Sequence, residues 1–291
     1  MSRIRILAWI LGLVGVACLA GALVITIAPK EPTSATGADI AATTPQGSAP
    51  ATRAPASASA SAPKPTPTHT PKPKAVTAPN ALAGWAWRSA DAQGTWQNGG
   101  YYIQNDAWNG SHGPQTIYAN SFHEIKVISD QPAGNTEIMT YPDVSGLYTG
   151  TDTPVSQFSA IYNTFSESMP SDVIGEAADD IWLNNWSIEI MMWVDTHNED
   201  PGSWLPVIGH TNIAGQNWTI YKNDSEFIFK LDHNETSGTT HVLPAIQWLM
   251  SHNQIPSNAG LTAVQFGWEI AGTHGPEEFN LHDYSLVGTK R

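Results

Sequence analysis

The stretch Trp-Ser-Ile-Glu-Ile-Met-Met-Trp-Val-Asp, residues 186–195, is the one around which the rest of the chain is organised. Its side chains fall into two alternating sets. One set is purely apolar, whereas the other begins with a carboxylate: Ile188, Ile190, Met192 and Val194 against Glu189, Met191, Trp193 and Asp195. Because successive side chains of a β-strand leave opposite faces of a sheet, the pattern predicts a strand. We expect the apolar set to face a core and the second set to carry a lone carboxylate on a polar face.

A second stretch, residues 264–270, repeats this arrangement. Val264, Phe266, Trp268 and Ile270 share one face, and Gln265, Gly267 and Glu269 share the other. Two carboxylates on polar, aromatic-lined faces of a sheet are what a glycosidase needs to cleave a glycosidic bond. The two stretches together therefore make Glu189 and Glu269 the leading catalytic candidates.

Charge and composition narrow the class of partner. The chain has 291 residues and a net charge of −13. Residues 1–82 hold seven basic and two acidic side chains, so the remainder holds six basic and 24 acidic ones, a balance of −18. Such a domain repels phosphate backbones, which argues against nucleic acid but not against a neutral polysaccharide. The single cysteine, Cys18, lies outside the remainder, so we expect neither disulfides nor thiol chemistry there.

The N-terminal part reads as two segments that precede one domain. An apolar run at 6–28 follows Arg3 and Arg5 and is long enough to span a bilayer, so residues 1–28 are interpreted as a signal-anchor, or otherwise a signal peptide. Residues 29–82 contain 11 of the 21 prolines, with Ala, Ser and Thr between them, and predict a disordered linker. The domain at 83–291 is expected to be exported, either secreted or tethered to the outer face of the membrane.

The domain itself shows many short alternating runs and one helical pattern. Runs near 100–105, 122–128 and 158–165 predict strands, and residues 218–231 predict a hairpin. Apolar residues at helical spacing predict a single helix at about 243–253, with Pro244 near its start. This profile predicts an all-β fold, a jelly roll or sandwich of two twisted antiparallel sheets with one helix.

Six motifs over residues 83–291 resemble those of glycoside hydrolase family 12, the small jelly-roll endoglucanases. The Glu-Ile-Met-Met-Trp run at 189–193 and the Gln-Phe-Gly-Trp-Glu run at 265–269 are similar to its two Glu strands. The other four, in family order, are Tyr101 to Trp108, Tyr141-Pro142-Asp143, Asp180-Ile181-Trp182-Leu183 and Leu205 to Gly209. Each motif alone is weak, but their common order makes the resemblance strong.

What the resemblance implies is a retaining endo-β-1,4-glucanase that acts without a metal or other cofactor. Glu189 matches the nucleophile, Glu269 the acid/base, and Asp180 an acid that tunes the nucleophile. The implied substrate-binding residues are Asn105, Trp108, Met191, Trp193 and Pro206. The second Asn of the family motif is Asp106 here, and the link from Asp180 to Glu189 is shorter than in the family. The implied partner is a β-glucan, and we expect a monomer.

Several alternatives remain open from the sequence. Asp179, next to Asp180, could be the functional acid of that pair. The cluster of Asp195, His197, Glu199 and Asp200 has no recognised metal-ligand spacing and is interpreted as a solvated turn. At the level of function, the alternatives are a membrane-tethered, lectin-like glycan-binding module and a hydrolase of xyloglucan or mixed-linkage glucan.

Overall fold

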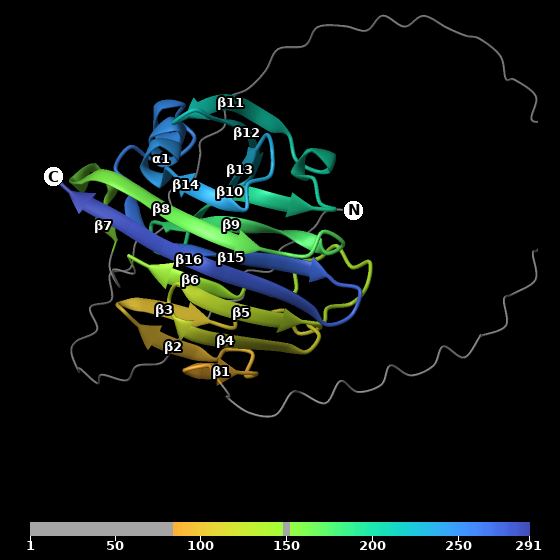
Figure 1. Cartoon of the computed structure of the whole chain (residues 1–291). Coiled ribbons are helices and arrows are strands. Elements are labelled where there is room, and N and C mark those ends of the chain that lie inside the picture. Colours follow the sequence, from red (N-terminus) through yellow and green to blue (C-terminus); the bar gives the residue numbers. More distant parts are fainter. Residues whose placement is uncertain (1–83, 148–151) are drawn as a thin grey trace, which may run out of the picture. The chain divides into compact units, whose positions relative to one another are not determined.

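The computed structural model describes residues 84–147 and 152–291, so the expected membrane segment and linker lie outside the described residues. Within this part the chain forms two sheets that lie one over the other, with one α-helix (Figure 1). No helix in the described ranges is long and apolar enough to cross a membrane. The predicted class, an all-β sandwich with a single helix, is confirmed.

The smaller sheet has six strands and the larger has ten. In spatial order the smaller sheet comprises β1 (Trp87–Ser89), β4 (Gln115–Ser121), β5 (Glu124–Ser129), β16 (Glu277–Lys290), β8 (Phe158–Ser168) and β14 (Ser237–Thr240). The larger one runs β11 (Val207–Ile213), β12 (Gln216–Asn223), β13 (Glu226–Leu231), β10 (Ile188–His197), β9 (Ile174–Leu183), β15 (Gly260–Gly272), β6 (Asp143–Gly146), β3 (Tyr101–Gln104) and β2 (Thr95–Asn98), with β7 (Thr153–Pro154) beside β15. Two short 3₁₀ turns, η1 (Val155–Gln157) and η2 (Pro201–Ser203), complete the list.

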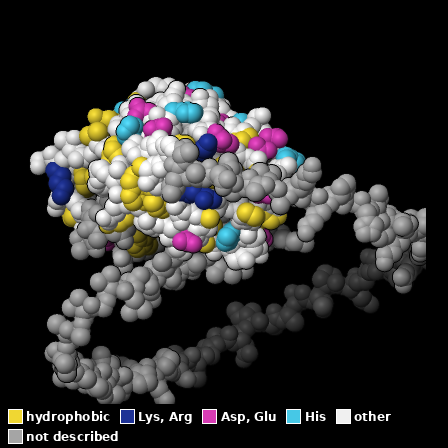
Figure 2. Space-filling view, turned by 60° about the horizontal axis from the view of Figure 1, so that its bottom comes forward, with side chains coloured by type: hydrophobic (Ala, Val, Ile, Leu, Met, Phe, Trp, Pro, Cys, Tyr) yellow, Lys and Arg dark blue, Asp and Glu magenta, His cyan; other side chains and the backbone are white. Residues whose placement is uncertain are grey.

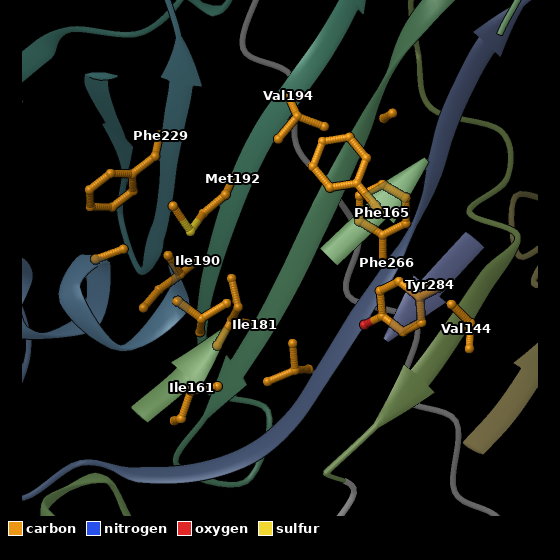
Figure 3. Packing of buried hydrophobic residues seen from close by; sticks show 14 of the residues in the cluster. Val144, Ile161, Phe165, Ile181, Ile190, Met192, Val194, Phe229, Phe266 and Tyr284 are labelled. Atoms are coloured by element: carbon orange, nitrogen blue, oxygen red, sulfur yellow. The ribbon is translucent and has the colours of Figure 1, made fainter. Parts of the chain in front are cut away.

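The core lies between the two sheets and uses the apolar set of each predicted strand. Ile190, Met192 and Val194 of β10 are at most 1 % exposed and belong to this core. On β15, Phe266 stacks at 5.0 Å on Phe165 of β8 and at 5.6 Å on Tyr284 of β16, measured between ring centroids (Figure 3). A buried Phe contributes about 1.5–3 kcal/mol. This stack therefore fixes which face of β15 turns away from the core.

Helix α1 (Val242–Ser251) closes one end of the sandwich. Its buried residues, Val242, Ala245, Ile246 and Leu249 among them, recur at helical spacing and join the core. Pro244 lies in the first turn, where its missing N–H would have no partner within the helix. The helix predicted at 243–253 is thus confirmed to within two residues at each end.

One pair of neighbouring strands departs from the expected antiparallel sheets. Strands β10 and β13 pair in parallel, with Glu189 beside Glu226, whereas the other strand pairs of the described residues are antiparallel. The cause is the connection after β10. It crosses to the far edge, where β11 begins, and two hairpins then bring the chain back, so that β13 arrives beside β10 in the same direction.

A β-bulge in β10 reverses the side on which Asp195 lies. Trp193 pairs with Ala178 but Asp195 pairs with Ala177, so one extra residue is inserted in β10. Because Ala177 belongs to the core, Asp195 faces the core as well and is only 2 % exposed. Two expectations were therefore wrong: Asp195 does not share the face of Glu189, and it does not lie in a solvated turn.

Candidate active site

The face of the ten-stranded sheet turned away from the core carries Glu189, Asp180 and Glu269, and we call it the site face. These residues come from three adjacent strands, in the order β10, β9 and β15. Glu189 lies opposite Trp182 of β9 and is partly exposed. Asp180 lies opposite Met191 of β10 on one side and Gln265 of β15 on the other. The alternation that placed the two glutamates on one face is confirmed.

Asp180 is the electrostatic link of the site. It is 6 % exposed, and its Oδ2 accepts a hydrogen bond from Trp182 Nε1 at 2.8 Å. Burial raises the pKa of Asp180 well above its usual range, and the charges of Glu189 and then Glu269 raise it further. Both glutamates therefore lie near enough to Asp180 to act on its proton.

Asp179, the open alternative, points the other way. It pairs with Met192 and Phe266, both core residues, and is fully buried. Asn163 of β8 donates a hydrogen bond to its Oδ1 across the core. Burial raises the pKa of Asp179 well above the ordinary value, and hydrogen bonds with Thr240 and Asn163 lower it by less. Asp180 is thus the acid available to the site.

Glu269 lies further along β15 and is 7 % exposed. It faces Glu176 across the β9–β15 pair, whereas Glu189 faces Trp182 across the β9–β10 pair. The two glutamates therefore flank Asp180 from opposite directions along β9.

Tyr141 adds a neutral group to the site. Its hydroxyl donates a hydrogen bond to the Ala178 carbonyl at 3.1 Å. Burial, and after it the charge of Asp180, raises the pKa of Tyr141 well above its usual range.

Further acids surround this group. Asp143 of β6 accepts a hydrogen bond from Gln265 Nε2 at 3.2 Å, and burial, then the charge of Asp106, raises its pKa well above the ordinary value. Burial also raises the pKa of Asp106 to about 6. Asp106 occupies the position that matches the second Asn of the family motif. Glu226, beside Glu189, was not singled out at all, because only the parallel pairing brings it there.

Glu226 is 6 % exposed, and its Oε2 accepts a hydrogen bond from Asn223 Nδ2 at 3.1 Å. In a parallel pair, residues in register leave the same face, so the side chain of Glu226 flanks that of Glu189. Two neighbouring carboxyl groups do not ionise independently. Glu189 thus has acidic neighbours on both β13 and β9.

Two of the expected substrate-binding residues are covered. Met191 and Trp193 lie on the same side of β10 as Glu189, but they are 1 % and 0 % exposed. Trp204 and Leu205, from the crossing connection after β10, pack onto them. The sequence pattern did not predict that this connection would cover the two residues. Neither residue offers a surface to a sugar, so the expectation that they flank the reacting sugar was wrong.

The prediction that Asn105 binds the substrate was also wrong. It is 1 % exposed, its amide donates to the Asp91 carbonyl at 2.9 Å, and Gln115 donates to its Oδ1 at 3.2 Å. The side chain of Asn105 therefore holds the loop after β3 in place and does not bind a sugar hydroxyl. Trp108, on the same loop, is half-buried, and Pro206, before β11, is exposed. They lie in loops next to β3 and β11, near opposite edges of the larger sheet, so a chain crossing the strands over Glu189 would run from one toward the other.

The turn between β9 and β10 carries an aromatic pair that the sequence interpretation missed. Trp186, in the turn, lies 5.4 Å from Trp182 between ring centroids, with the ring planes at 53°. Both rings are half-buried. Because Trp182 faces Glu189 and donates to Asp180, the pair adjoins the candidate catalytic residues.

Behind the site, between the sheets, lies a second buried carboxyl pair. Glu167 of β8 is 3 % exposed, contacts Asp195 through a side-chain hydrogen bond, and accepts one from Trp268 Nε1 at 3.0 Å. Burial raises the pKa of Glu167 to about 8, and Asp195 contributes in the same direction. His197 Nε2 lies 3.1 Å from Asp195 Oδ1 at the edge of this cluster.

The charged side chains on one face of the molecule are dispersed. Figure 2 shows one face of the molecule, on which Lys and Arg side chains are few and separated, with Asp, Glu and His among uncharged ones. That face offers no continuous basic surface for a polyanion.

Two sheets, one helix between the two Glu strands, and acids on three central strands define a jelly roll of the glycoside hydrolase family 12 type. Comparison with solved structures confirms this fold. The chain is 25 % identical to the xyloglucanase domain of NopAA, a type three effector from Sinorhizobium fredii solved with cellobiose, over 70 % of this chain and 99 % of that one, with a TM-score of 0.63. No family model and no curated protein sequence matches the chain.

Two further structures show the same fold at lower identity. A family 12 xyloglucanase from Bacillus licheniformis is 23 % identical and covers 70 % of this chain and all of its own, with a TM-score of 0.62. The endoglucanase Cel12A from Rhodothermus marinus is 17 % identical over 70 % of this chain and all of its own, also at 0.62. Similarity at this level establishes the fold, and the activity has to be argued from the site.

Proposed function

We propose that the chain is a retaining endo-β-1,4-glucanase that hydrolyses internal bonds of cellulose-type glucans. The observation that carries this proposal is the triad of acids on β10, β9 and β15, in which Glu189 and Glu269 both raise the pKa of Asp180. The solved structures support a glycoside hydrolase acting on glucans, since they comprise xyloglucanases and endoglucanases.

Glu189 is the proposed nucleophile. It is partly exposed, and it stands next to an acid that keeps its proton at a pH where an ordinary carboxyl group has lost it. The Oδ2 of Asp180 accepts a hydrogen bond from Trp182 Nε1, which holds the carboxyl group in place. A neutral Asp180 leaves the negative charge on Glu189, where it is needed to attack the anomeric carbon.

Glu269 is the proposed acid/base. A retaining mechanism needs a protonated carboxyl group that donates to the leaving oxygen, and the same group then takes a proton from the water that cleaves the glycosyl-enzyme. Glu269 is nearly buried, faces Glu176 across the β9–β15 pair, and lies near enough to Asp180 for its charge to raise the pKa of that acid.

The substrate is proposed to cross the strands between the sides marked by Trp108 and Pro206. A neutral glucan suits an acidic face because it carries no charge to be repelled. The solved structures of the same fold include both xyloglucanases and endoglucanases, so a xyloglucan or mixed-linkage glucan is the alternative substrate for the same residues.

The test is hydrolysis of carboxymethyl-cellulose, barley β-glucan and xyloglucan by the full-length chain, beside Glu189→Gln and Glu269→Gln. We expect the parent to lower viscosity quickly. The Glu269 variant should lose about 10²- to 10⁴-fold in kcat, and the Glu189 variant at least as much. Glu278→Gln, on β16 of the other sheet, is the matched control and should keep full activity.

Two outcomes would contradict the proposal. If the parent is inert on all three glucans yet binds oligosaccharides, the chain is a lectin-like binding module. If it is active but its first product has the inverted anomeric configuration, the nucleophilic role of Glu189 fails.

Localisation is a second proposal and rests on the sequence alone. Residues 6–28 direct export and leave the domain secreted or tethered to the outer face of the membrane. Protease treatment of intact cells that leaves the domain undigested would contradict it.

A further inference from the structure

One buried acid of the site face has no part in the mechanism described above. Glu176 of β9 is 0 % exposed. Ala177, the next residue, belongs to the core, so Glu176 projects from the site face, as Asp180 does four residues later. A substrate does not reach a fully buried side chain. Glu176 can therefore act on the reaction only through a neighbour.

The neighbour is Glu269. The two residues lie directly opposite each other in the antiparallel pair of β9 and β15. Side chains placed in this way have Cβ atoms about 4.5–5.5 Å apart, which lets two Glu side chains bring their carboxyl groups into contact. Glu269 is 7 % exposed, so it is the member that a substrate can reach. We call Glu176 and Glu269 the carboxyl pair.

The backbone holds this part of β15 on both sides. A Cβ on Gly175 of β9 would collide with the Glu269 carbonyl oxygen, so glycine allows the two strands to approach closely here. On the other side of β15, the Ile270 N–H donates to the Thr140 carbonyl at 3.0 Å, and the Ile270 carbonyl accepts from the Met139 N–H at 3.0 Å. The segment that carries Glu269 is thus fixed against β9.

Other titratable groups face the carboxyl pair from the neighbouring elements. The charge of its β15 member acts on Asp180 of β9 and on Tyr141 before β6, and so does the charge of Asp143 of β6. On β10, the residue in register with its β9 member is the neutral Thr196. His197, the next residue of β10, contacts a carboxylate on the core side instead. Acidic neighbours favour a proton on the pair.

Two carboxyl groups in this arrangement do not titrate separately. Like charges directly opposite each other on a sheet repel, and the repulsion is stronger away from water. Two carboxylates that share a site therefore hold one proton between them, and the protons come off in steps that belong to the pair. The proposed mechanism needs a proton at this place, because Glu269 must be protonated when the glycosidic bond breaks.

We propose that Glu176 is a positioning residue for the acid/base, and that the carboxyl pair holds one proton, which Glu269 delivers. This inference rests on the proposed function. In the first step the proton passes from Glu269 to the leaving oxygen, while the glycosidic bond breaks and Glu189 bonds to the anomeric carbon. Two adjacent carboxylates remain. Their repulsion is relieved in the second step, when Glu269 takes a proton from the water that displaces Glu189.

The first experiment follows the protonation of the pair directly, so it does not depend on catalysis. The full-length chain is labelled with ¹³C at its glutamate carboxyl carbons, and NMR spectra are recorded across pH. The Glu269 and Glu176 signals are those missing in Glu269→Gln and Glu176→Asp. In the parent we expect the two signals to change together, in two shared steps. In Glu176→Gln the Glu269 signal should change about one pH unit lower.

Kinetics on barley β-glucan give the second readout. In Glu176→Gln the basic limb of the kcat/KM profile should move down by about one pH unit, while kcat at low pH stays within about threefold of the parent. Glu176→Asp keeps a carboxyl group and should give a limb between the two. Glu278→Gln removes an exposed negative charge on β16 and should match the parent in both readouts. A purely structural role of Glu176 would lower kcat at every pH and leave the limb in place.

Two results overturn the inference: independent titration of the two signals in the parent, or a Glu269 signal that changes at the same pH in the parent and in Glu176→Gln. The first result needs only the parent and an assignment, so it decides the matter even where Glu176→Gln does not fold. Failure of the proposed function looks different, because the parent would hydrolyse no glucan although the two signals still change together.

Discussion

Asp179 and Asp180 are neighbours in the chain and differ in nothing but the face of β9 from which they project. Burial raises the pKa of both. Asp179 faces the core and accepts a hydrogen bond from Asn163, so its neighbours are neutral groups. Asp180 meets Glu189 and Glu269, so its neighbours are charges that depend on its proton. The same residue type is therefore a structural element on one face and a tuning group on the other.

The largest expected effect concerns the acids of the core side and is a change in stability with pH. The folded-state pKa of Glu167, about 8, lies above its ordinary 4.5. The stability that its proton contributes is fully present below pH 4.5 and is lost as the pH rises toward 8. Glu167→Gln keeps an acceptor for Trp268 and cannot ionise, so the variant should exceed the parent by roughly 3 kcal/mol at pH 9 and equal it at pH 4.

Urea unfolding of both proteins across this pH range measures the difference. Glu278→Gln, at an exposed ion pair with Lys126, should leave the curve of the parent unchanged. Parallel curves for the parent and Glu167→Gln would show that Glu167 ionises normally.

The next effect in size compares the two aspartates directly. Asp180→Asn replaces the ionisable carboxyl group beside Glu189 by an amide, which cannot release or take up a proton. We therefore expect kcat to fall about a hundredfold with little change in stability. Asp179→Asn replaces a protonated acid by an isosteric amide and should alter kcat less than about twofold. Steady-state kinetics on barley β-glucan and thermal unfolding of both variants distinguish the roles. A similar loss of kcat in both would remove the distinction between the faces.

The smallest effect concerns Glu226, the carboxyl group that the parallel pairing adds to the site face. Replacing it by Gln removes one negative charge beside Glu189, so Glu189 should ionise at lower pH. We expect the acidic limb of the kcat/KM profile to move down by about half a pH unit to one unit, which is less than tenfold in rate at a given pH. A limb that stays in place, with kcat lowered at every pH, would assign Glu226 a structural role only.

Much of the fold could be predicted from the sequence because the patterns that indicate strands and helices are local. Alternation placed Ile190 in the core and Glu189 on the opposite face, since a strand can do nothing else with successive side chains. Helical spacing and Pro244 located the single helix almost to the residue. The ordered motifs led to the jelly roll, and the solved structures confirm it.

The site was predicted less completely, and each miss has a non-local cause. Met191 and Trp193 lie on the same side of β10 as Glu189, as the alternation predicts. However, Trp204 and Leu205 of the connection after β10 pack over them. Asn105 lies in the expected motif, but its side-chain amide is hydrogen-bonded to the Asp91 carbonyl and to Gln115, which belong to other segments. Trp186 was overlooked because its contact with Trp182 depends on a turn that is held against β15.

The sequence by itself determined which residues can share a face, because the period of a strand is a property of the backbone. Only the tertiary structure decided which residues meet across strands. The return of the chain through β11 and β12 makes β13 parallel to β10 and places Glu226 beside Glu189. One inserted residue in β10 turns Asp195 from the site face into the core. Register and strand order depend on contacts between distant segments, and no local pattern encodes them.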